Sequence, residues 1–289
     1  MNLVALPGGI GRLEQDGSVS ELDLPHPSVA SLLSEHGGPA AMDAAGACGT
    51  RGSLGLQEVT GASMLAPGAV VWGVGLNYRS KQLATGRPRP DEPVLFAKAS
   101  SSFTGTGSPI CVPAAAPECV DYEGEIAVMI GSHLDGATVH EAAEGVAGYL
   151  AANDVTARDV MRSSGNPTLA KSFRGFGQLG NAMACVHGAA ALEAIPLSTR
   201  VNGDLRQQDD SDGMLLSVAE LLALLSRYVL LRPGDVVLTG TPAGTGDETG
   251  RYLAPGDTVE VKVGNLPALV SDVTAPASRL SDMASEVPA

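Results

Sequence analysis

Acidic side chains are concentrated at the start of a predicted strand, in the sequence Asp-Tyr-Glu-Gly-Glu of residues 121–125. Side chains alternate between the two faces of a strand, so Asp121, Glu123 and Glu125 are expected to share one face. Three carboxylates on one face repel one another unless water surrounds them or a cation binds them. The apolar run of residues 126–130 follows at once, which indicates that this strand enters a core.

A second acidic cluster, residues 153–159, follows another apolar run and contains Asp154. Two interpretations of the acidic residues remain open. Charged residues are mostly exposed, so the first cluster can be a solvated strand edge. Together, however, the clusters offer hard oxygen ligands and contain no histidine or cysteine, which favours Mg²⁺, Mn²⁺ or Ca²⁺ over Zn²⁺. We predict a metal site, with Mg²⁺ as the ion.

Lysines stand in or beside three predicted elements that would position this site. The strand of residues 94–98 ends in Lys98, and a lysine beside a core usually extends its ammonium group toward solvent. Lys171 lies between apolar neighbours. Residues 79–91, rich in glycine, proline and charge, contain Lys81, and we predict a mobile loop that closes over a substrate.

Turn residues and apolar spacing predict the other elements. Residues 29–33 and 217–228 are predicted helices, the second clearly amphipathic, and residues 136–149 are also expected to be helical. The small residues of 37–55 predict a loop. Residues 239–246 form a glycine-rich loop that lacks the lysine of a phosphate-binding loop but can approach a small anion.

Composition limits the possible partners. The 289 residues carry a net charge of −14, which disfavours nucleic acid and anionic membranes as partners. Four cysteines without a C-x-x-C spacing indicate reduced thiols and a cytoplasmic location. The start of the chain lacks a secretory signal, and no apolar run reaches the length of a membrane span.

The order of the motifs resembles the fumarylacetoacetate hydrolase superfamily over residues 70–270. The matching stretches lie at residues 75–79, 96–98, 121–125, 153–159, 171–173, 201–203 and 233–242. The resemblance implies an α+β, mostly β fold: a mixed β-roll catalytic domain at 66–280 behind a small N-terminal domain at 1–65, with a flexible tail at 281–289. It also implies a homodimer acting on a small-molecule substrate, a 2-oxo or 1,3-dicarbonyl acid.

The same resemblance implies roles for individual residues. It assigns the metal to Glu123, Glu125 and Asp154. It implies that Lys171 and Thr241 face the substrate. We predict that these two residues and Lys81 are catalytic, and that substrate is also bound by Tyr78, Lys98, Arg158, Met161 and Gly240. Hydrolases of the family carry a water-activating His-Glu pair where this chain has Lys81 and Ala84.

Three functions follow from these residues. The first is a metal-dependent hydrolase or decarboxylase that cleaves a C–C bond through an enolate, with Lys81 or another group replacing the pair. The second is a tautomerase, isomerase or cyclase, which needs enolate stabilisation and proton transfer but no activated water. The third is a binding protein that retains the fold without catalysis.

Overall fold

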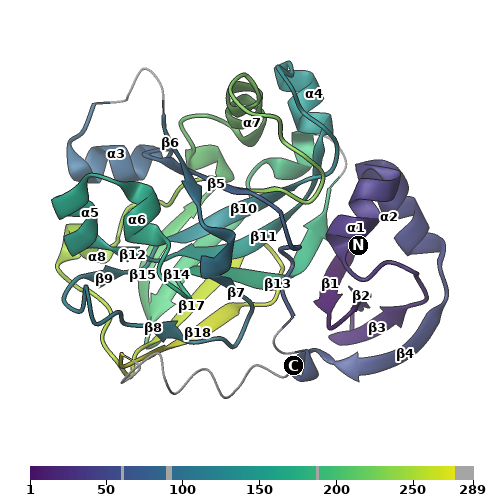
Figure 1. Cartoon of the computed structure of the whole chain (residues 1–289), viewed down its shortest axis with the longest axis horizontal. Coiled ribbons are helices and arrows are strands. Elements are labelled where there is room, and N and C mark those ends of the chain that lie inside the picture. The colour runs from purple at the N-terminus through teal and green to yellow at the C-terminus, as the bar shows by residue number, and fades with distance from the viewer. Residues whose placement is uncertain (60–61, 89–92, 187–188, 277–289) are drawn as a thin grey trace.

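The computed structural model describes residues 1–59, 62–88, 93–186 and 189–276, whose strands form a large mixed sheet, a second sheet and a separate pair (Figure 1). The large sheet has the order β4 (Thr50–Gly55), β3 (Ser18–Leu22), β2 (Gly9–Leu13), β1 (Asn2–Leu6), β13 (Gly177–Cys185), β11 (Val146–Asp154), β10 (Gly124–Ile130), β16 (Val236–Leu238), β5 (Val71–Gly75) and β6 (Val94–Lys98), with β7 (Phe103–Thr104) pairing to β13. The second sheet has the order β15 (Asp204–Asp210), β14 (Pro196–Val201), β17 (Thr258–Val263), β18 (Leu269–Thr274) and β8 (Ile110–Cys111). The pair is β9 (Val120–Asp121) and β12 (Thr156–Ala157).

Short helices flank the sheets. They are α1 (Val29–His36), α2 (Gly38–Ala47), α3 (Arg79–Thr85), α4 (Val139–Glu144), α5 (Arg158–Ser164), α6 (Pro167–Lys171), α7 (Val218–Ser226) and α8 (Gly246–Thr249). Single 3₁₀ turns lie at Leu56–Glu58, Ser100–Ser102, Ala189–Leu192 and Ser211–Gly213. None of the helices in the described ranges combines the length and apolar character needed to cross a membrane. The mostly β fold agrees with the prediction.

Strand β10 is buried on both faces because a different layer covers each one. Ile126, Val128 and Ile130 belong to a core shared with the second sheet, whose strands β14 and β17 contact β10. Ala127 and Met129 face the other way, into a core that contains residues of α1 and α2. The continuous apolar run therefore reflects period-two alternation between two cores. The prediction that this strand enters a core is confirmed.

The N-terminal segment joins the large sheet through β1, which pairs with β13 in the register Leu3↔Met183. Figure 1 shows this segment in purple at one side of the molecule. Its helices share a core with β10, β11 and β13. The domain boundary at residue 65 stays a prediction, and the predicted tail at 281–289 lies outside the described residues.

Two predicted helices are confirmed and begin at capping residues. Helix α1 starts after Ser28, whose hydroxyl accepts a hydrogen bond from the amide of Ser31. Helix α7 starts after Ser217, and Glu220 completes a reciprocal capping box. Such caps satisfy backbone N–H groups that would otherwise lack partners at a helix start.

Two other predictions about local structure are wrong. Residues 37–55 form α2 and β4 rather than a loop, because alanine favours helix and the glycine at position 131 leaves room for the start of α2 at Gly38. Of residues 136–149, only α4 is helical. The chain enters β11 at Val146, where the residues pair with β10 and β13 and are buried.

Candidate active site

Three buried carboxylates, from Glu123, Glu125 and Asp154, gather where β10 begins and β11 ends. The register Gly124↔Asn153 places these strand ends side by side, so the two acidic motifs become neighbours. One oxygen of each carboxylate lies within 4.8 Å of the other two. The three residues are only 6%, 2% and 1% exposed, so the interpretation as a solvated strand edge is wrong.

Basic side chains neutralise part of this negative charge. Lys98 Nζ donates to Oδ1 of Asp154, and Lys171 Nζ lies 2.6 Å from Oδ2 of the same residue. Lys171 and Arg158 also donate to Glu123. Burial opposes the charge on Lys171, but Asp154 and Glu123 outweigh it and raise the pKa of this lysine. Burial dominates at Lys98 and lowers its pKa, and its enclosed side chain contradicts the prediction that it extends toward solvent.

Glu125 has no lysine or arginine within ion-pair distance in the described part of the chain. Its Oε2 accepts one hydrogen bond, from the amide of Gly240 at 2.8 Å. Burial raises the pKa of Glu125, and the nearby charges of Asp154 and Glu123 raise it further. A buried carboxylate in such surroundings requires a proton or an additional cation.

This arrangement fits a divalent cation. The ligand atoms are hard oxygens, which Mg²⁺, Mn²⁺ and Ca²⁺ prefer. A cation at the three carboxylates would supply the counter-charge that Glu125 lacks. Each ionised carboxylate offers about four lone-pair sites, so contacts with Lys171 leave acceptor capacity for an ion.

We expect Glu125→Gln to stabilise the metal-free protein by about 1–3 kcal/mol, the usual cost of a buried group without its partner. Glutamine keeps an oxygen for the Gly240 amide but carries no charge. Folding disfavours the ionised form of Glu125, so wild-type stability should fall as pH rises through its raised pKa, and the variant should lack this fall. Urea unfolding in EDTA at several pH values measures this, with exposed Glu144→Gln as control. Equal pH dependence in wild type and Glu125→Gln would contradict the expectation.

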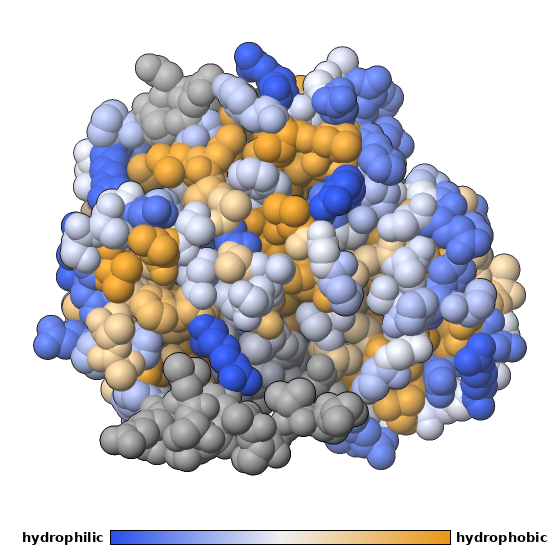
Figure 2. All heavy atoms as spheres, in the orientation of Figure 1, coloured by the Kyte–Doolittle hydropathy of each residue, from blue (hydrophilic) through white to orange (hydrophobic). Residues whose placement is uncertain are grey.

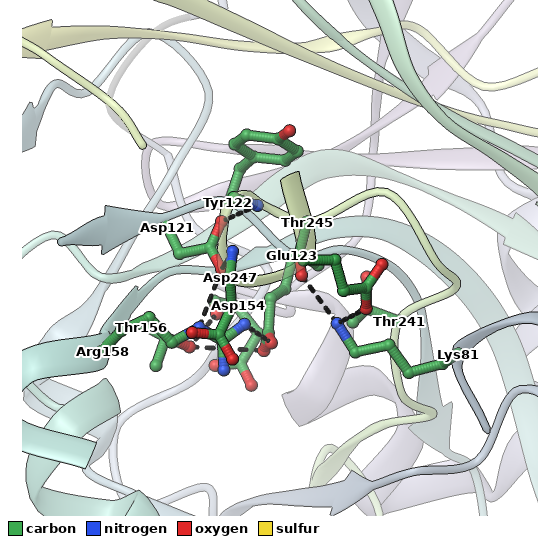
Figure 3. Close-up of polar contacts among 12 residues, drawn as sticks. Lys81, Asp121, Tyr122, Glu123, Asp154, Thr156, Arg158, Thr241, Thr245 and Asp247 are labelled. Atoms are coloured by element: carbon green, nitrogen blue, oxygen red, sulfur yellow. Dashed lines mark hydrogen bonds and ion pairs between the residues drawn. The ribbon is translucent and has the colours of Figure 1, made fainter. Parts of the chain in front are cut away.

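Asp121 binds backbone amides and Arg158 and is not one of the three clustered carboxylates. Its carboxylate accepts hydrogen bonds from Arg158 Nε at 2.7 Å and from the amides of Gly246 and Asp247 at 2.6 and 3.0 Å. Figure 3 shows these contacts beside the site. Amides in and after the glycine-rich loop of residues 239–246 thus bind the protein's own carboxylates, which weakens the prediction that this loop approaches an external anion.

A cavity of about 370 Å³ opens beside the carboxylates. Its wall includes Glu123 and Glu125, together with the other predicted site residues Lys81, Arg158, Met161, Lys171 and Thr241. Tyr78, Lys98 and Gly240 are not among the lining residues in the described ranges. Tyr78 is fully buried in the core, so its role and those of Lys98 and Gly240 as substrate contacts stay predictions.

Lys81 lies on helix α3, so the prediction of a loop at this residue is wrong, while closure of the segment over a substrate stays a prediction. Its Nζ is 2.5 Å from Oε1 of Glu248 and 2.7 Å from the hydroxyl of Thr245. The hydroxyl of the preceding Ser80 donates to Asp209 at 2.6 Å. These contacts hold Lys81 in the cavity wall with 8% of its surface exposed. Residues 89–92 of the predicted loop lie outside the described residues.

Sequence reasoning missed Glu248 and Gln207. Glu248 lies two residues after the glycine-rich loop of residues 239–246, and this position is the feature of the sequence that could have marked it as a site residue. Gln207 donates to the hydroxyl of Thr241 at 2.8 Å and to the carbonyl of Pro242 at 2.9 Å. It accepts a hydrogen bond from the amide of Gly124 at 3.0 Å and so links this loop to β10. No local motif marks Gln207.

The chain resembles known proteins in sequence. Residues 70–274 match the family model described as fumarylacetoacetate (FAA) hydrolase C-terminal. The mitochondrial oxaloacetate tautomerase fahd2 of Xenopus laevis is 36% identical over 204 residues, which cover 69% of this chain and 64% of that protein. The chain therefore spans slightly less than two thirds of that curated relative.

Solved structures resemble nearly the whole chain. Fumarylacetoacetate hydrolase from Exiguobacterium antarcticum has a TM-score of 0.79 and 30% identity, covering 95% of this chain and 99% of that one. The 5-carboxymethyl-2-hydroxymuconate delta-isomerase from Mycobacterium smegmatis has a TM-score of 0.75 and 28% identity, covering 95% and 100%. These likenesses extend beyond the matched family region into the N-terminal segment.

Proposed function

Because the chain belongs to the fumarylacetoacetate hydrolase family, we propose that it is an enzyme that interconverts keto and enol forms of a small 2-oxo or 1,3-dicarbonyl acid. The observation that carries the proposal is the cavity wall, which contains two lysines beside buried carboxylates but no histidine among its described residues. Isomerisation needs proton transfer and stabilisation of charge on oxygen, not an activated water. The wall offers groups for both tasks.

We propose Mg²⁺, with Mn²⁺ or Ca²⁺ as substitutes, as the ion held by Glu123, Glu125 and Asp154. A bound divalent ion supplies Lewis acidity, which lowers the energy of negative charge developing on a substrate oxygen. The support for this cofactor is the set of hard oxygen ligands and the missing counter-charge of Glu125. The two lysines of the cavity wall add positive charge, so that an anionic substrate can approach a protein of net charge −14.

Lys81 is paired with Glu248 and therefore enters the reaction as an ammonium group that can donate a proton. In the enol-to-keto direction, the carbon beside the carbonyl gains a proton and the enol oxygen loses one. The proton that leaves the enol oxygen returns to the neutral Lys81 amine through solvent, so the step balances and no water or co-reactant is consumed. The ammonium group of Lys171 would face the substrate's enol oxygen and stabilise negative charge on it. Thr241, whose hydroxyl accepts a hydrogen bond from Gln207, lines the same cavity wall.

The names of similar proteins support isomerisation. The Xenopus relative is called an oxaloacetate tautomerase, and the Mycobacterium smegmatis structure is called a delta-isomerase. Arg158 in the cavity wall could face a substrate carboxylate, although it already binds Asp121 and Glu123. Met161 supplies an apolar contact in the same wall.

Proton exchange tests this function directly. The enzyme with Mg²⁺ is incubated in D₂O with a panel of 2-oxo acids, and NMR follows the hydrogens at C3. Exchange without cleavage supports isomerisation. Bound Mg²⁺ with neither exchange nor cleavage of any panel member would contradict an enzymatic role and support a binding protein.

C–C bond cleavage is the second candidate function. The specific observation in its favour is the ion pair between Lys81, which stands where the family has its histidine, and Glu248, because this pair offers an acid–base couple in the cavity wall. Cleavage of acylpyruvates or decarboxylation of oxaloacetate at ordinary enzymatic rates, followed in the same NMR samples, would favour it. The product peaks distinguish the two functions.

We expect Glu248→Gln to lower kcat by about tenfold or more and to change KM less. Glutamine keeps an oxygen for the amide of Gly244, which donates to Oε2 at 2.6 Å, but removes the charge that holds Lys81. Steady-state kinetics measure the effect, and Glu220→Gln, at the cap of α7, serves as control. A kcat unchanged from wild type would show that Glu248 does not position Lys81.

We also propose that the protein is a cytoplasmic homodimer. Figure 2 shows apolar residues gathered on the face that carries α3, β6 and α6. Leu83, Val94 and Leu169 on these elements are 75%, 47% and 58% exposed. Exposed apolar groups of this kind favour contact with another protein surface. Analytical ultracentrifugation distinguishes a dimer from a monomer.

A further inference from the structure

We propose that His26, Glu35 and His36 form a second metal site, which binds a transition-metal ion such as Zn²⁺ and is separate from the acidic cluster. His26 precedes α1, and the other two residues end that helix. One ligand atom of each residue lies within 4.8 Å of the other two. Imidazole nitrogens suit Zn²⁺, Ni²⁺ and Cu²⁺, whereas the all-oxygen cluster suits harder ions.

Two of the distances between the ligand groups lie on either side of the separation expected for tetrahedral zinc. Nε2 of His26 is 2.9 Å from Oε2 of Glu35, and Nε2 of His36 is 3.9 Å from Oε1 of the same carboxylate. Zinc with bonds of about 2.0–2.2 Å places its ligand atoms roughly 3.3–3.5 Å apart, between these two distances. The two imidazole rings meet edge to face with centroids 5.3 Å apart. Small side-chain movements would therefore complete the site.

His26 is held in place and has unused binding capacity. It lies between Pro25 and Pro27, which restrict the backbone, and only 7% of its surface is exposed. Its Nδ1 is buried without a hydrogen-bond partner. A neutral imidazole has one N–H and one lone pair. Because Nδ1 has no partner, the N–H can move to it without breaking another hydrogen bond, and the Nε2 lone pair that faces Glu35 is then available to a metal ion.

The carboxylate and the second imidazole are accessible from solvent. The side chains of Glu35 and His36 are 66% and 35% exposed, so an ion can enter and water can fill a fourth position. Glu35 has no lysine or arginine within ion-pair distance in the described residues. Its negative charge is therefore available to a cation.

An ion at this site would fix the end of α1 to the segment before it. Helix α1 also packs on the turn that precedes β16. There Ala30 lies directly against Gly234, which has no side chain to clash with it. A Cβ atom at Gly234 would lie 2.7 Å from the Cβ of Ala30. Metal binding should therefore stabilise the packing of α1 on this turn. Strand β16 follows the turn and leads to the glycine-rich loop of residues 239–246.

Copper binding tests the proposal on the full chain, with saturating Mg²⁺ present to occupy the acidic cluster. Electron paramagnetic resonance of bound Cu²⁺ should show nitrogen coupling in the wild type. His36→Gln and Glu35→Gln should weaken Cu²⁺ and Zn²⁺ binding by about tenfold or more, because even an outer partner of a ligand contributes about that factor. His140→Gln, an exposed histidine on α4, is the control and should bind as wild type does.

Thermal unfolding provides a second readout. Zn²⁺ should raise the Tm of the wild type and of His140→Gln, but not that of His36→Gln. The two substituted ligands are exposed enough for the variants to fold, which circular dichroism checks. A wild-type copper signal without nitrogen coupling, or metal affinities unchanged in both ligand variants, would overturn the proposal.

Discussion

Glu125→Ala and Asp154→Ala are each expected to abolish tight Mg²⁺ binding. Each variant removes one of three protein oxygens from a site whose remaining positions water would fill. Isothermal titration calorimetry with the purified variants measures the affinity, and Glu144→Ala is the exposed control. Retention of wild-type Mg²⁺ affinity by both variants would remove the basis of the metal-site assignment.

The same two variants should differ in stability. Asp154 is a counter-ion for the buried Lys98 and Lys171, so its loss leaves buried charge unpaired and is expected to cost about 3–5 kcal/mol. Glu125 has no basic partner in the described residues, and its loss carries no such cost. Urea unfolding without metal measures the difference. The Glu125 variant is therefore the cleaner test of metal binding.

Lys81→Met is expected to lower kcat by about 10²–10⁴-fold with a much smaller rise in KM. Methionine fills similar space but cannot donate a proton, and loss of a general acid or base commonly has an effect of this size. Steady-state kinetics with a substrate identified by proton exchange provide the measurement. Arg79→Met, at the exposed start of the same helix, is the control.

The division between kcat and KM distinguishes two roles of Lys81. A large rise in KM with an unchanged kcat would show that Lys81 only attracts the substrate's carboxylate. Combining Lys81→Met with Glu248→Gln tests the pair as a unit. If Glu248 acts through Lys81, the double variant should be no slower than Lys81→Met alone.

Local patterns indicated a buried cluster of carboxylates because both acidic motifs adjoin buried strands, and the structure brings these carboxylates together. Period-two alternation placed Glu123 and Glu125 on one face, and the pairing of β10 with β11 added Asp154. The apolar run of residues 126–130 also predicted a core strand correctly. The alternation and the apolar run are patterns within a few residues of sequence, whereas the approach of Asp154 depends on strand pairing.

The site features that the sequence did not predict depend on contacts between residues far apart in the chain. The partner of Lys81 is Glu248, on a distant part of the chain, and no periodicity connects them. Lys98 was expected to reach solvent because nothing near it in sequence indicates that Asp154 neutralises it inside the protein. Helix α2 was missed because small residues suit both a loop and a close helix contact.

The pairing of β1 with β13 has a consequence for synthesis on the ribosome. One edge of β1 pairs with the adjacent β2, but on the other edge the partner of Asn2 is Ala184, so about 180 residues must be added before β1 can pair with β13. At about 5–20 residues per second, this takes roughly 10–40 s. During that time the edge of β1 that pairs with β13 is open, and a nascent chain released before β13 is made should aggregate or bind chaperones.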